Sequence, residues 1–170
     1  MENGLITVLF FCGQRVKVSL FQKKSVQIGI RTQNNCTHGF KILYAPWIHT
    51  YGVQEVNKFI HDIVKSSDPV YITFDVDCLD PAFAPGTVNP VVGGLSNAQA
   101  LPILHSLGDL NLIGMDILEV APAYDHAEIM ALAAATIGHD YLCLLAQKNG
   151  AQAFSIGTKL NEKQSGNAKT

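Results

Sequence analysis

Apolar residues recur along the chain at two spacings, which predict strands and helices in alternation. Residues 25–32, SVQIGIRT, predict a short β-branched strand, and residues 69–75, PVYITFD, predict a buried one. Between them, residues 52–66 place apolar side chains three and four positions apart, the spacing of an amphipathic helix. Residues 111–120, NLIGMDILEV, predict another strand. Upstream, RVKVSLF at residues 15–21 alternates like a half-buried strand.

Capping residues mark the starts of two further helices. Ser96 with Gln99 three positions later is a capping box, and Pro102 is expected to kink or delay the helix that follows. Asp125 with Glu128 predicts a long helix through residue 147. The apolar face of the first of these helices is expected to include Leu101, Leu104 and Leu107. The alternation predicts an α/β fold whose parallel sheet is covered on both faces.

Composition narrows the class of protein. The chain has 170 residues and is 48% hydrophobic, which suits one globular domain. Its formal net charge is -2, so we expect neither nucleic acid nor a membrane surface as a partner. No apolar run reaches membrane-spanning length, and LITVLFFC at residues 5–12 lacks the preceding positive charge of a secretion signal. The four cysteines form no CxxC pair, which favours reduced thiols and a cytoplasmic location.

Three aspartates, Asp75, Asp77 and Asp80, lie at and just after the end of the buried strand at residues 69–75. In an extended chain Asp75 and Asp77 would point to the same side, and two such carboxylates repel unless a cation or a proton lies between them. An isolated D-x-D pair is more often a turn that caps backbone amides. Here the next strand also carries an acid near its carboxyl end, Glu119, which favours a site for Mn²⁺ or Mg²⁺. Asp80 is expected to brace the loop, and Asp116 to support the site or bond to the backbone.

Three long motifs carry a family resemblance: TFDVDCLDPAFAPG, GGLS and GMDILEVAPAYDHAEIMALAAA. They closely resemble the carboxyl-terminal half of the ureohydrolases, the family of arginases and agmatinases, and most closely the bacterial-type agmatinases. The resemblance covers residues 25–148. It leaves residues 1–24 as a divergent segment and residues 149–170 as a polar tail that we expect to be disordered.

The resemblance implies a fold, a cofactor and a reaction. The fold would be three-layered around a central parallel sheet, here as a partial domain, in a chain that forms homo-oligomers. The cofactor would be two Mn²⁺ ions, with Asp75 and Asp77 as ligands and Asp77 bridging them. Glu119 would hold the substrate guanidinium. The reaction would be hydrolysis of a guanidino group, agmatine to putrescine and urea.

The sequence also departs from the family pattern. Neither DAHxD nor GGDH, the motifs that bring histidine ligands, occurs in it, so we expect this chain to be inactive alone. The family loop GTGTP is GTVNP here, which places Val88 and Asn89 near the guanidinium site. His126 is the one histidine expected near a substrate entrance. His38, His49 and His61 are expected on the surface or in loops, whereas His105 and His139 fall on predicted helices.

Two other functions compete with this interpretation. A phosphatase with an aspartyl nucleophile also places D-x-D after a buried strand, but it needs a cation for the phosphoryl group. No Lys or Arg occurs between Asp77 and Lys148, which argues against that class. The alternative is a non-catalytic truncated relative that acts through subunit association, because loss of half a sheet would expose apolar strand edges.

Overall fold

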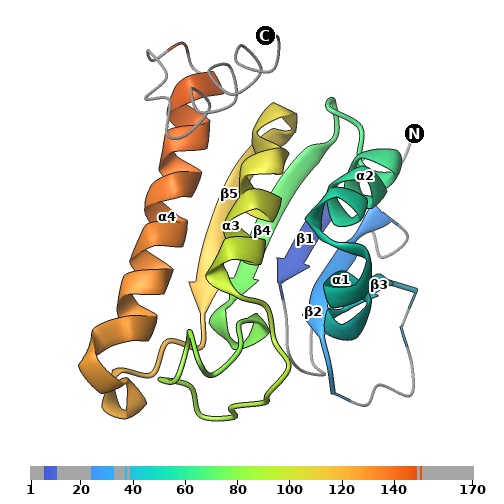
Figure 1. Cartoon of the computed structure of the whole chain (residues 1–170). Coiled ribbons are helices and arrows are strands. Elements are labelled where there is room, and N and C mark those ends of the chain that lie inside the picture. Colours follow the sequence, from blue (N-terminus) through green and yellow to red (C-terminus); the bar gives the residue numbers. More distant parts are fainter. Residues whose placement is uncertain (1–5, 11–23, 33–36, 38, 149, 151–170) are drawn as a thin grey trace, which may run out of the picture.

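The described strands form one parallel sheet in the order β3-β2-β1-β4-β5. The computed structural model describes residues 6–10, 24–32, 37, 39–148 and 150. The strands are β1 (Ile6–Phe10), β2 (Val26–Ile30), β3 (Lys41–Tyr44), β4 (Pro69–Asp75) and β5 (Asn111–Leu118). The helices are α1 (Ala45–Tyr51), α2 (Val53–Ile63), α3 (Asn97–Ser106) and α4 (Ile129–Lys148), with short 3-10 turns η2 (Val76–Cys78), η3 (Leu107–Asp109), η4 (Pro122–Tyr124) and η5 (His126–Glu128). Figure 1 shows this arrangement.

The centre of the sheet is β1, which lies between β2 and β4. Val8 pairs with Val26 on one side and Ile72 on the other, and all three are fully buried. The ring of Phe10 stacks on that of Phe74 with centroids 4.5 Å apart. The apolar stretch that starts the sequence is therefore a core strand. The predicted strand RVKVSLF lies outside the described residues, and so does the tail predicted to be disordered, residues 149–170, apart from Gly150.

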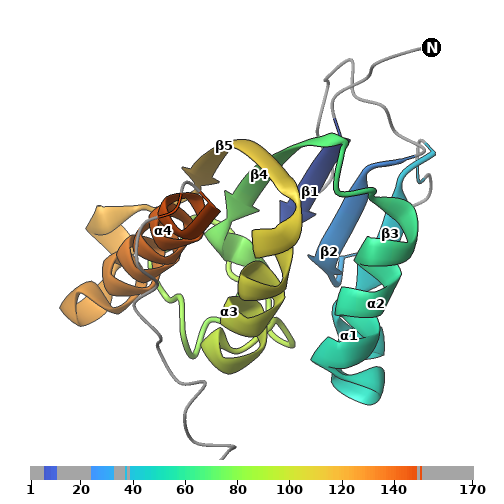
Figure 2. The same ribbon diagram turned by 90° about the horizontal axis from the view of Figure 1, so that it is seen from above.

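The described helices form one layer against one face of the sheet. Figure 2 shows α1, α2, α3 and α4 on the same side of the strands. Within this layer α2 packs on α3, and α3 packs on α4. Fully buried side chains from α1, α2 and α3, such as Ile48, Ile60 and Ile103, join the strands in the core. The second helical layer predicted for the opposite face has no counterpart among the described residues.

The predicted capping residues do begin their helices. Both halves of the Ser96–Gln99 capping box are present, and α3 begins at Asn97, so Pro102 does not delay it. The carboxylate of Asp125 accepts the N–H groups of Met130 (3.1 Å) and Ala131 (2.9 Å), as predicted for a helix cap. The helix itself begins at Ile129, because a 3-10 turn intervenes.

The helical span His126–Lys148, which joins η5 to α4, is long and apolar enough to cross a membrane by length and composition alone. The expectation that no apolar run reaches membrane-spanning length does not hold for this span. Six of its residues are nevertheless buried: Met130, Ala133, Ala134, Ile137, Tyr141 and Leu144. Since α4 packs on α3 and β5, the same composition describes a core helix of a globular domain.

Candidate metal and substrate site

The acidic pair lies where β4 ends and the chain turns. Asp75 is the last residue of β4 and is 4% exposed, and Asp77 lies in the turn η2 and is 7% exposed. The expectation of an extended chain through Asp77 was wrong, because residues 76–78 form a 3-10 turn. Within this turn one carboxylate oxygen of Asp75 accepts the N–H of Asp77 at 2.8 Å. The turn, rather than the pleat of a strand, therefore sets the relation of the two aspartates.

The guanidinium of Arg31, which follows β2 on the far side of β1 from β4, fixes this turn, a feature not expected from the sequence. Arg31 follows β2 directly and donates to the carbonyl oxygens of Asp77 (2.8 Å) and Leu79 (3.1 Å). Its Nε donates to the carbonyl of Val91 at 2.8 Å. The sequence did carry a signal for this contact. Arg31 comes at the end of a predicted strand, and parallel strands bring their carboxyl ends, where the acids lie, to the same side of the sheet.

Replacing Arg31 with methionine is expected to lower the free energy of unfolding by about 2 kcal/mol, because charged donors to two loop segments are lost. Chemical denaturation measures this change. The control is Lys24→Met, since Lys24 forms a part-exposed pair with Asp68 and should cost under about 1 kcal/mol. We call the hydrogen bonds from Arg31 to the carbonyl oxygens of the turn and the loop the Arg31 clamp. Equal losses of unfolding free energy in the two variants would show that the clamp does not stabilise the turn.

Asp80 braces the loop, as predicted. One of its carboxylate oxygens accepts the N–H groups of Gly93 (2.7 Å) and Gly94 (3.1 Å), and the other accepts that of Ala82 (3.0 Å). The bond from Ala82, with those from the two glycines, lowers the pKa of Asp80. The carboxylate therefore ties the two ends of the loop together and is not free for a ligand.

Burial raises the pKa of both aspartates of the pair. For Asp75 it rises to about 7, first through burial and then through repulsion from Asp77 and Glu119, while the N–H of Asp77 opposes the shift. For Asp77 burial is again the main cause, opposed by hydrogen bonding to the buried hydroxyl of Thr87 and by the charge of Arg31. One oxygen of Asp77, Oδ1, is buried without a hydrogen-bond partner in the described part of the chain. A buried carboxylate with an unpaired oxygen beside a second carboxylate suits a cation.

Glu119 stands at the end of the neighbouring strand. It follows β5 directly, is exposed, and has a φ of 64°, which is unusual for a residue with a side chain. Its charge acts on Asp75, so the structure brings these two acids near each other as expected. Backbone conformations of this kind cluster at ligand sites, where the surroundings hold them in place.

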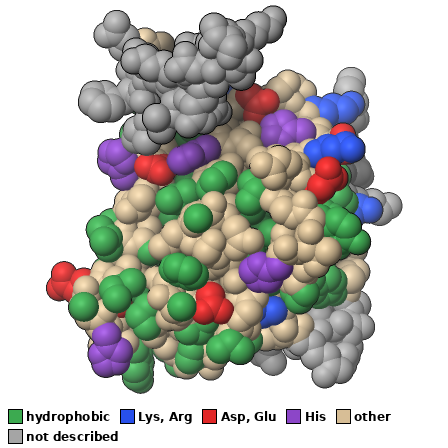
Figure 3. All heavy atoms as spheres, in the orientation of Figure 1, with side chains coloured by type: hydrophobic (Ala, Val, Ile, Leu, Met, Phe, Trp, Pro, Cys, Tyr) green, Lys and Arg blue, Asp and Glu red, His purple; other side chains and the backbone are tan. Residues whose placement is uncertain are grey.

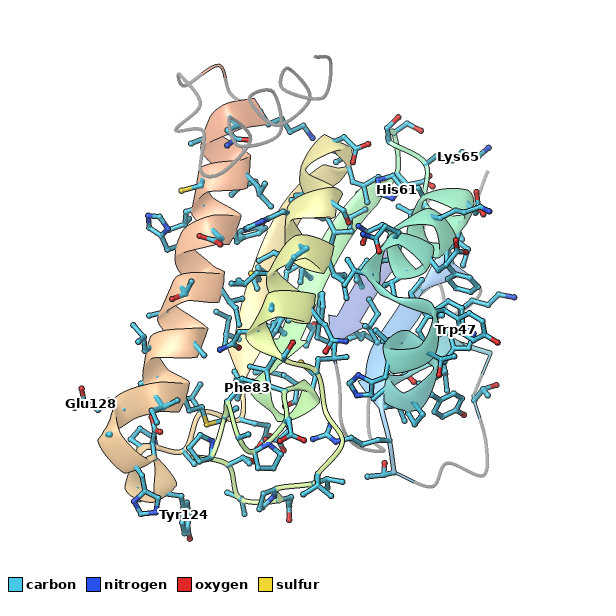
Figure 4. The ribbon with its side chains drawn as sticks, viewed as in Figure 1. Trp47, His61, Lys65, Phe83, Tyr124 and Glu128 are labelled. Atoms are coloured by element: carbon cyan, nitrogen blue, oxygen red, sulfur yellow. The ribbon has the colours of Figure 1, made fainter. Side chains whose placement is uncertain are left out.

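The other two predicted site residues lie in exposed loops. The backbone N–H of Asn89 donates to the Thr87 hydroxyl at 3.3 Å, which places Asn89 two residues from a neighbour of Asp77. His126 lies exposed in η5. The two loops meet where the N–H of Ala121 donates to the carbonyl of Gly86 at 2.9 Å. In Figure 4, Phe83 of the first loop and Tyr124 of the second lie toward the same end of the sheet.

The other described histidines lie on helices. His49 is on α1 and His61 on α2, and both are exposed, which agrees with the expected surface or loop position. His105 and His139 lie on α3 and α4, as predicted. His38 is outside the described residues. In Figure 4, His61 lies at the end of the sheet opposite to Phe83 and Tyr124.

The described residues fit one part of a divalent-cation site. Asp75 and Asp77 offer hard oxygen ligands. Oδ1 of Asp77 is buried and, among the described residues, has no hydrogen-bond partner, so it is available to coordinate a cation. Among the residues that the structure describes, no group of three or more His, Cys, Asp or Glu side chains could hold a metal ion. A closed ligand shell therefore needs further donors.

A parallel α/β sheet with a buried acidic pair at a strand end is the arrangement expected of the ureohydrolases. Comparison with known proteins indicates the same class. The profile of the arginase family matches residues 12–143, so the chain belongs to the arginase family. Among curated relatives, the agmatinase of Chromobacterium violaceum is 56% identical over 130 residues, which are 74% of this chain and 39% of that protein. The agmatinase of Proteus mirabilis is 55% identical over 124 residues, 73% of this chain and 40% of that protein. The chain thus spans about two fifths of the length of these relatives.

Solved structures agree on the fold. A hypothetical agmatinase from Burkholderia thailandensis superposes with a TM-score of 0.79 at 42% identity, covering 88% of this chain and 53% of that one. Proclavaminate amidino hydrolase from Streptomyces clavuligerus superposes with a TM-score of 0.76 at 30% identity, covering 86% of this chain and 56% of that one. The predicted α/β fold of ureohydrolase type, present as a partial domain, is confirmed.

Proposed function

We propose that this chain forms the carboxyl-terminal part of a manganese-dependent ureohydrolase that converts agmatine to putrescine and urea. The observation that carries the proposal is the buried pair of Asp75 and Asp77, with an unpartnered oxygen on Asp77 and the charge of Glu119 close by. The choice of agmatine is supported by relatives named agmatinases that are more than half identical over the matched region.

The roles of the residues follow from their surroundings. Asp75 and Asp77 would hold the ions, and bound divalent ions supply a nucleophile near neutral pH by lowering the pKa of water. Burial keeps competing water from the two carboxylates, which strengthens their attraction for a cation. The carboxylate of Glu119 would receive the planar N–H groups of the guanidinium in two parallel hydrogen bonds. This pairing would fix the orientation of the carbon that is attacked.

The loops would complete the substrate pocket. Asn89 and His126 belong to the two loops that meet at Gly86 and Ala121; we assign Asn89 to the surroundings of the guanidinium and His126 to the substrate entrance. The Arg31 clamp and the Asp80 brace would keep the first loop in place while substrate enters. With two carboxylate ligands the chain alone would bind ions weakly and turn over no substrate.

A manganese titration of the purified chain tests the ligand assignment. Weak binding of Mn²⁺, followed by calorimetry, is expected to fall at least tenfold in Asp77→Asn because half of the ligand pair loses its charge. The control is Asp109→Asn, whose carboxylate pairs with His61 at the other end of the sheet. An equal loss in the two variants would contradict the assignment.

The same preparation tests the activity of the chain alone. Urea release from agmatine is expected to be absent, and manganese-dependent release by the purified chain would refute the prediction. A stable oligomer that binds no Mn²⁺ would favour the alternative of a non-catalytic relative acting through subunit association.

A further inference from the structure

The Arg31 clamp joins segments that lie far apart in the sequence. The guanidinium donates to carbonyl oxygens of β2, of the turn η2 with the residue after it, and of the far end of the loop. The acceptors are Gly29 (3.4 Å), Asp77 (2.8 Å), Cys78 (3.4 Å), Leu79 (3.1 Å) and Val91. All three guanidinium nitrogens take part, and these acceptors match its five N–H groups. Arg31 is therefore committed to backbone carbonyls and is not available to an anionic ligand.

The turn that carries Asp77 also rests directly on β2. Gly29 has a φ of +91°, and a Cβ built at this position would lie 3.2 Å from the Cβ of Cys78. Because β1 lies between β2 and β4 in the sheet, this contact crosses the end of the central strand. The place of η2 is thus fixed by a strand two positions from β4, and Arg31 closes the contact with hydrogen bonds.

Hydrogen bonds hold the two sides of η2 in different ways. On the N–H side, Asp77 donates to the carboxylate of Asp75 at 2.8 Å. Leu79 donates to the carbonyl of Val76 at 3.0 Å, so both bonds stay within β4 and the turn. On the carbonyl side, Arg31 ties Asp77 and Leu79 to β2. Without Arg31 these carbonyls would lose charged donors and turn toward other partners, and rotation of the Asp77 backbone would move its carboxylate.

Positive charge is scarce around this turn. The loops that follow β4 and β5 lie at the lower end of Figure 1, whereas most Lys and Arg side chains visible in Figure 3 lie toward the upper right. No Lys or Arg occurs between Asp77 and Lys148. These two loops therefore contain no second cation that could take over the hydrogen bonds of Arg31.

We propose that Arg31 is a positioning residue for the divalent-cation site and sets the Mn²⁺ affinity of the chain. It would act through the backbone of η2, by holding the Asp77 carboxylate in the buried position in which Oδ1 has no hydrogen-bond partner among the described residues. Groups that hold a metal ligand in place commonly change metal affinity by about 10- to 100-fold. The inference rests on the assignment of Asp75 and Asp77 as ligands in the proposed function.

A Mn²⁺ titration of the full chain tests this role, with free Mn²⁺ measured by its electron paramagnetic resonance signal. Arg31→Met is expected to weaken Mn²⁺ binding about tenfold, because the turn loses its tie to β2. Arg31→Lys is expected to weaken it about threefold, since one ammonium group cannot serve both the turn and the loop. The control is Ile60→Ala on α2, which removes a fully buried side chain from the core and should leave Mn²⁺ affinity unchanged.

Two further measurements separate positioning from loss of stability. Chemical denaturation shows whether each variant is folded, and Ile60→Ala is expected to lose at least as much stability as Arg31→Met. Amide hydrogen exchange at Asp77 and Leu79 is expected to be faster in Arg31→Met than in Ile60→Ala, since both amides belong to the hydrogen bonds of the turn. If Arg31→Met does not fold, Arg31→Lys carries the test.

The outcomes distinguish this inference from the proposed function. Unchanged Mn²⁺ affinity in folded Arg31→Met or Arg31→Lys, or an equal loss of affinity in Ile60→Ala, would overturn the positioning role. If Asp77→Asn lowered the affinity while both Arg31 variants did not, the role of Arg31 would fall and the ligand assignment would stand. If Asp77→Asn left the affinity unchanged, the proposed function would be contradicted, and this inference with it.

Discussion

Replacing Asp75 with asparagine is expected to raise the free energy of unfolding of the metal-free chain at pH 8 by an amount of the order of 4 kcal/mol. The folded protein holds the pKa of this carboxyl at about 7, compared with 3.8 for an ordinary aspartate. Between these values the folded state retains a proton that the unfolded state has lost, so stability falls as pH rises from about 4 to about 7. Above pH 7 the folded protein buries a charged carboxylate and bears the whole free-energy penalty. Asparagine carries no charge, so the variant does not bear this penalty.

Denaturation with urea in the presence of EDTA measures this effect. The advantage of Asp75→Asn should shrink steadily as the pH is lowered from 8 to 5, because the wild-type carboxyl then takes up its proton. Asparagine retains an oxygen for the N–H of Asp77, so that hydrogen bond survives. Asp109→Asn serves as the control, with a carboxylate that is largely exposed. If Asp75→Asn were less stable than the wild type at pH 8, the charged Asp75 carboxylate would not destabilise the metal-free protein. That result would contradict the argument that a bound cation is needed to offset burial and repulsion at this site.

Replacing Gly94 with alanine is expected to cost about 3 kcal/mol or more, and to loosen the loop that carries Asp80. A Cβ at this position would lie 2.5 Å from the backbone nitrogen of Asp80 and from the carbonyl carbon of Leu79. These are backbone atoms, so no side-chain rotation relieves the overlap. The close approach belongs to the bridge between Leu79 and Leu95, in which the N–H of Asp80 donates to the carbonyl of Leu95 at 2.8 Å.

The neighbouring glycine provides the matched control. Gly93 has a φ of +82° and nothing within 4 Å of a built Cβ, so Gly93→Ala should cost only about 1 kcal/mol of backbone strain. Both variants are compared by chemical denaturation. Similar losses in the two would show that the loop moves aside, and would contradict a rigid contact between Gly94 and the Leu79–Asp80 backbone.

Local patterns predicted several elements well. The apolar run PVYITFD predicted β4 with its observed ends, and the Ser96–Gln99 spacing predicted the start of α3. The cap at Asp125 predicted α4, although the 3-10 turn delays its first residue to Ile129. The helix α1 was missed because it has seven residues, too few to show a period. Features of this kind are encoded by residues within one or two turns of each other.

The contacts that shape the site come from segments far apart in the sequence. Arg31 reaches the carbonyls of Asp77 and Leu79 across more than forty residues, and Thr87 approaches Asp77 from the following loop. The central place of β1 also depends on pairing with β2 and β4, which its own composition does not specify. These pairings follow from how the whole sheet closes and not from any local pattern.

The sequence by itself determined that acids stand at the ends of β4 and β5, because the ends of strands are marked by local patterns of apolar and polar residues. Only the tertiary structure decided how those acids behave. Burial beneath the loop raises the pKa of Asp75 and Asp77 and leaves Oδ1 of Asp77 without a partner. The physical reason is that desolvation and repulsion depend on which distant segments fold over a charge, and no sequence window contains them.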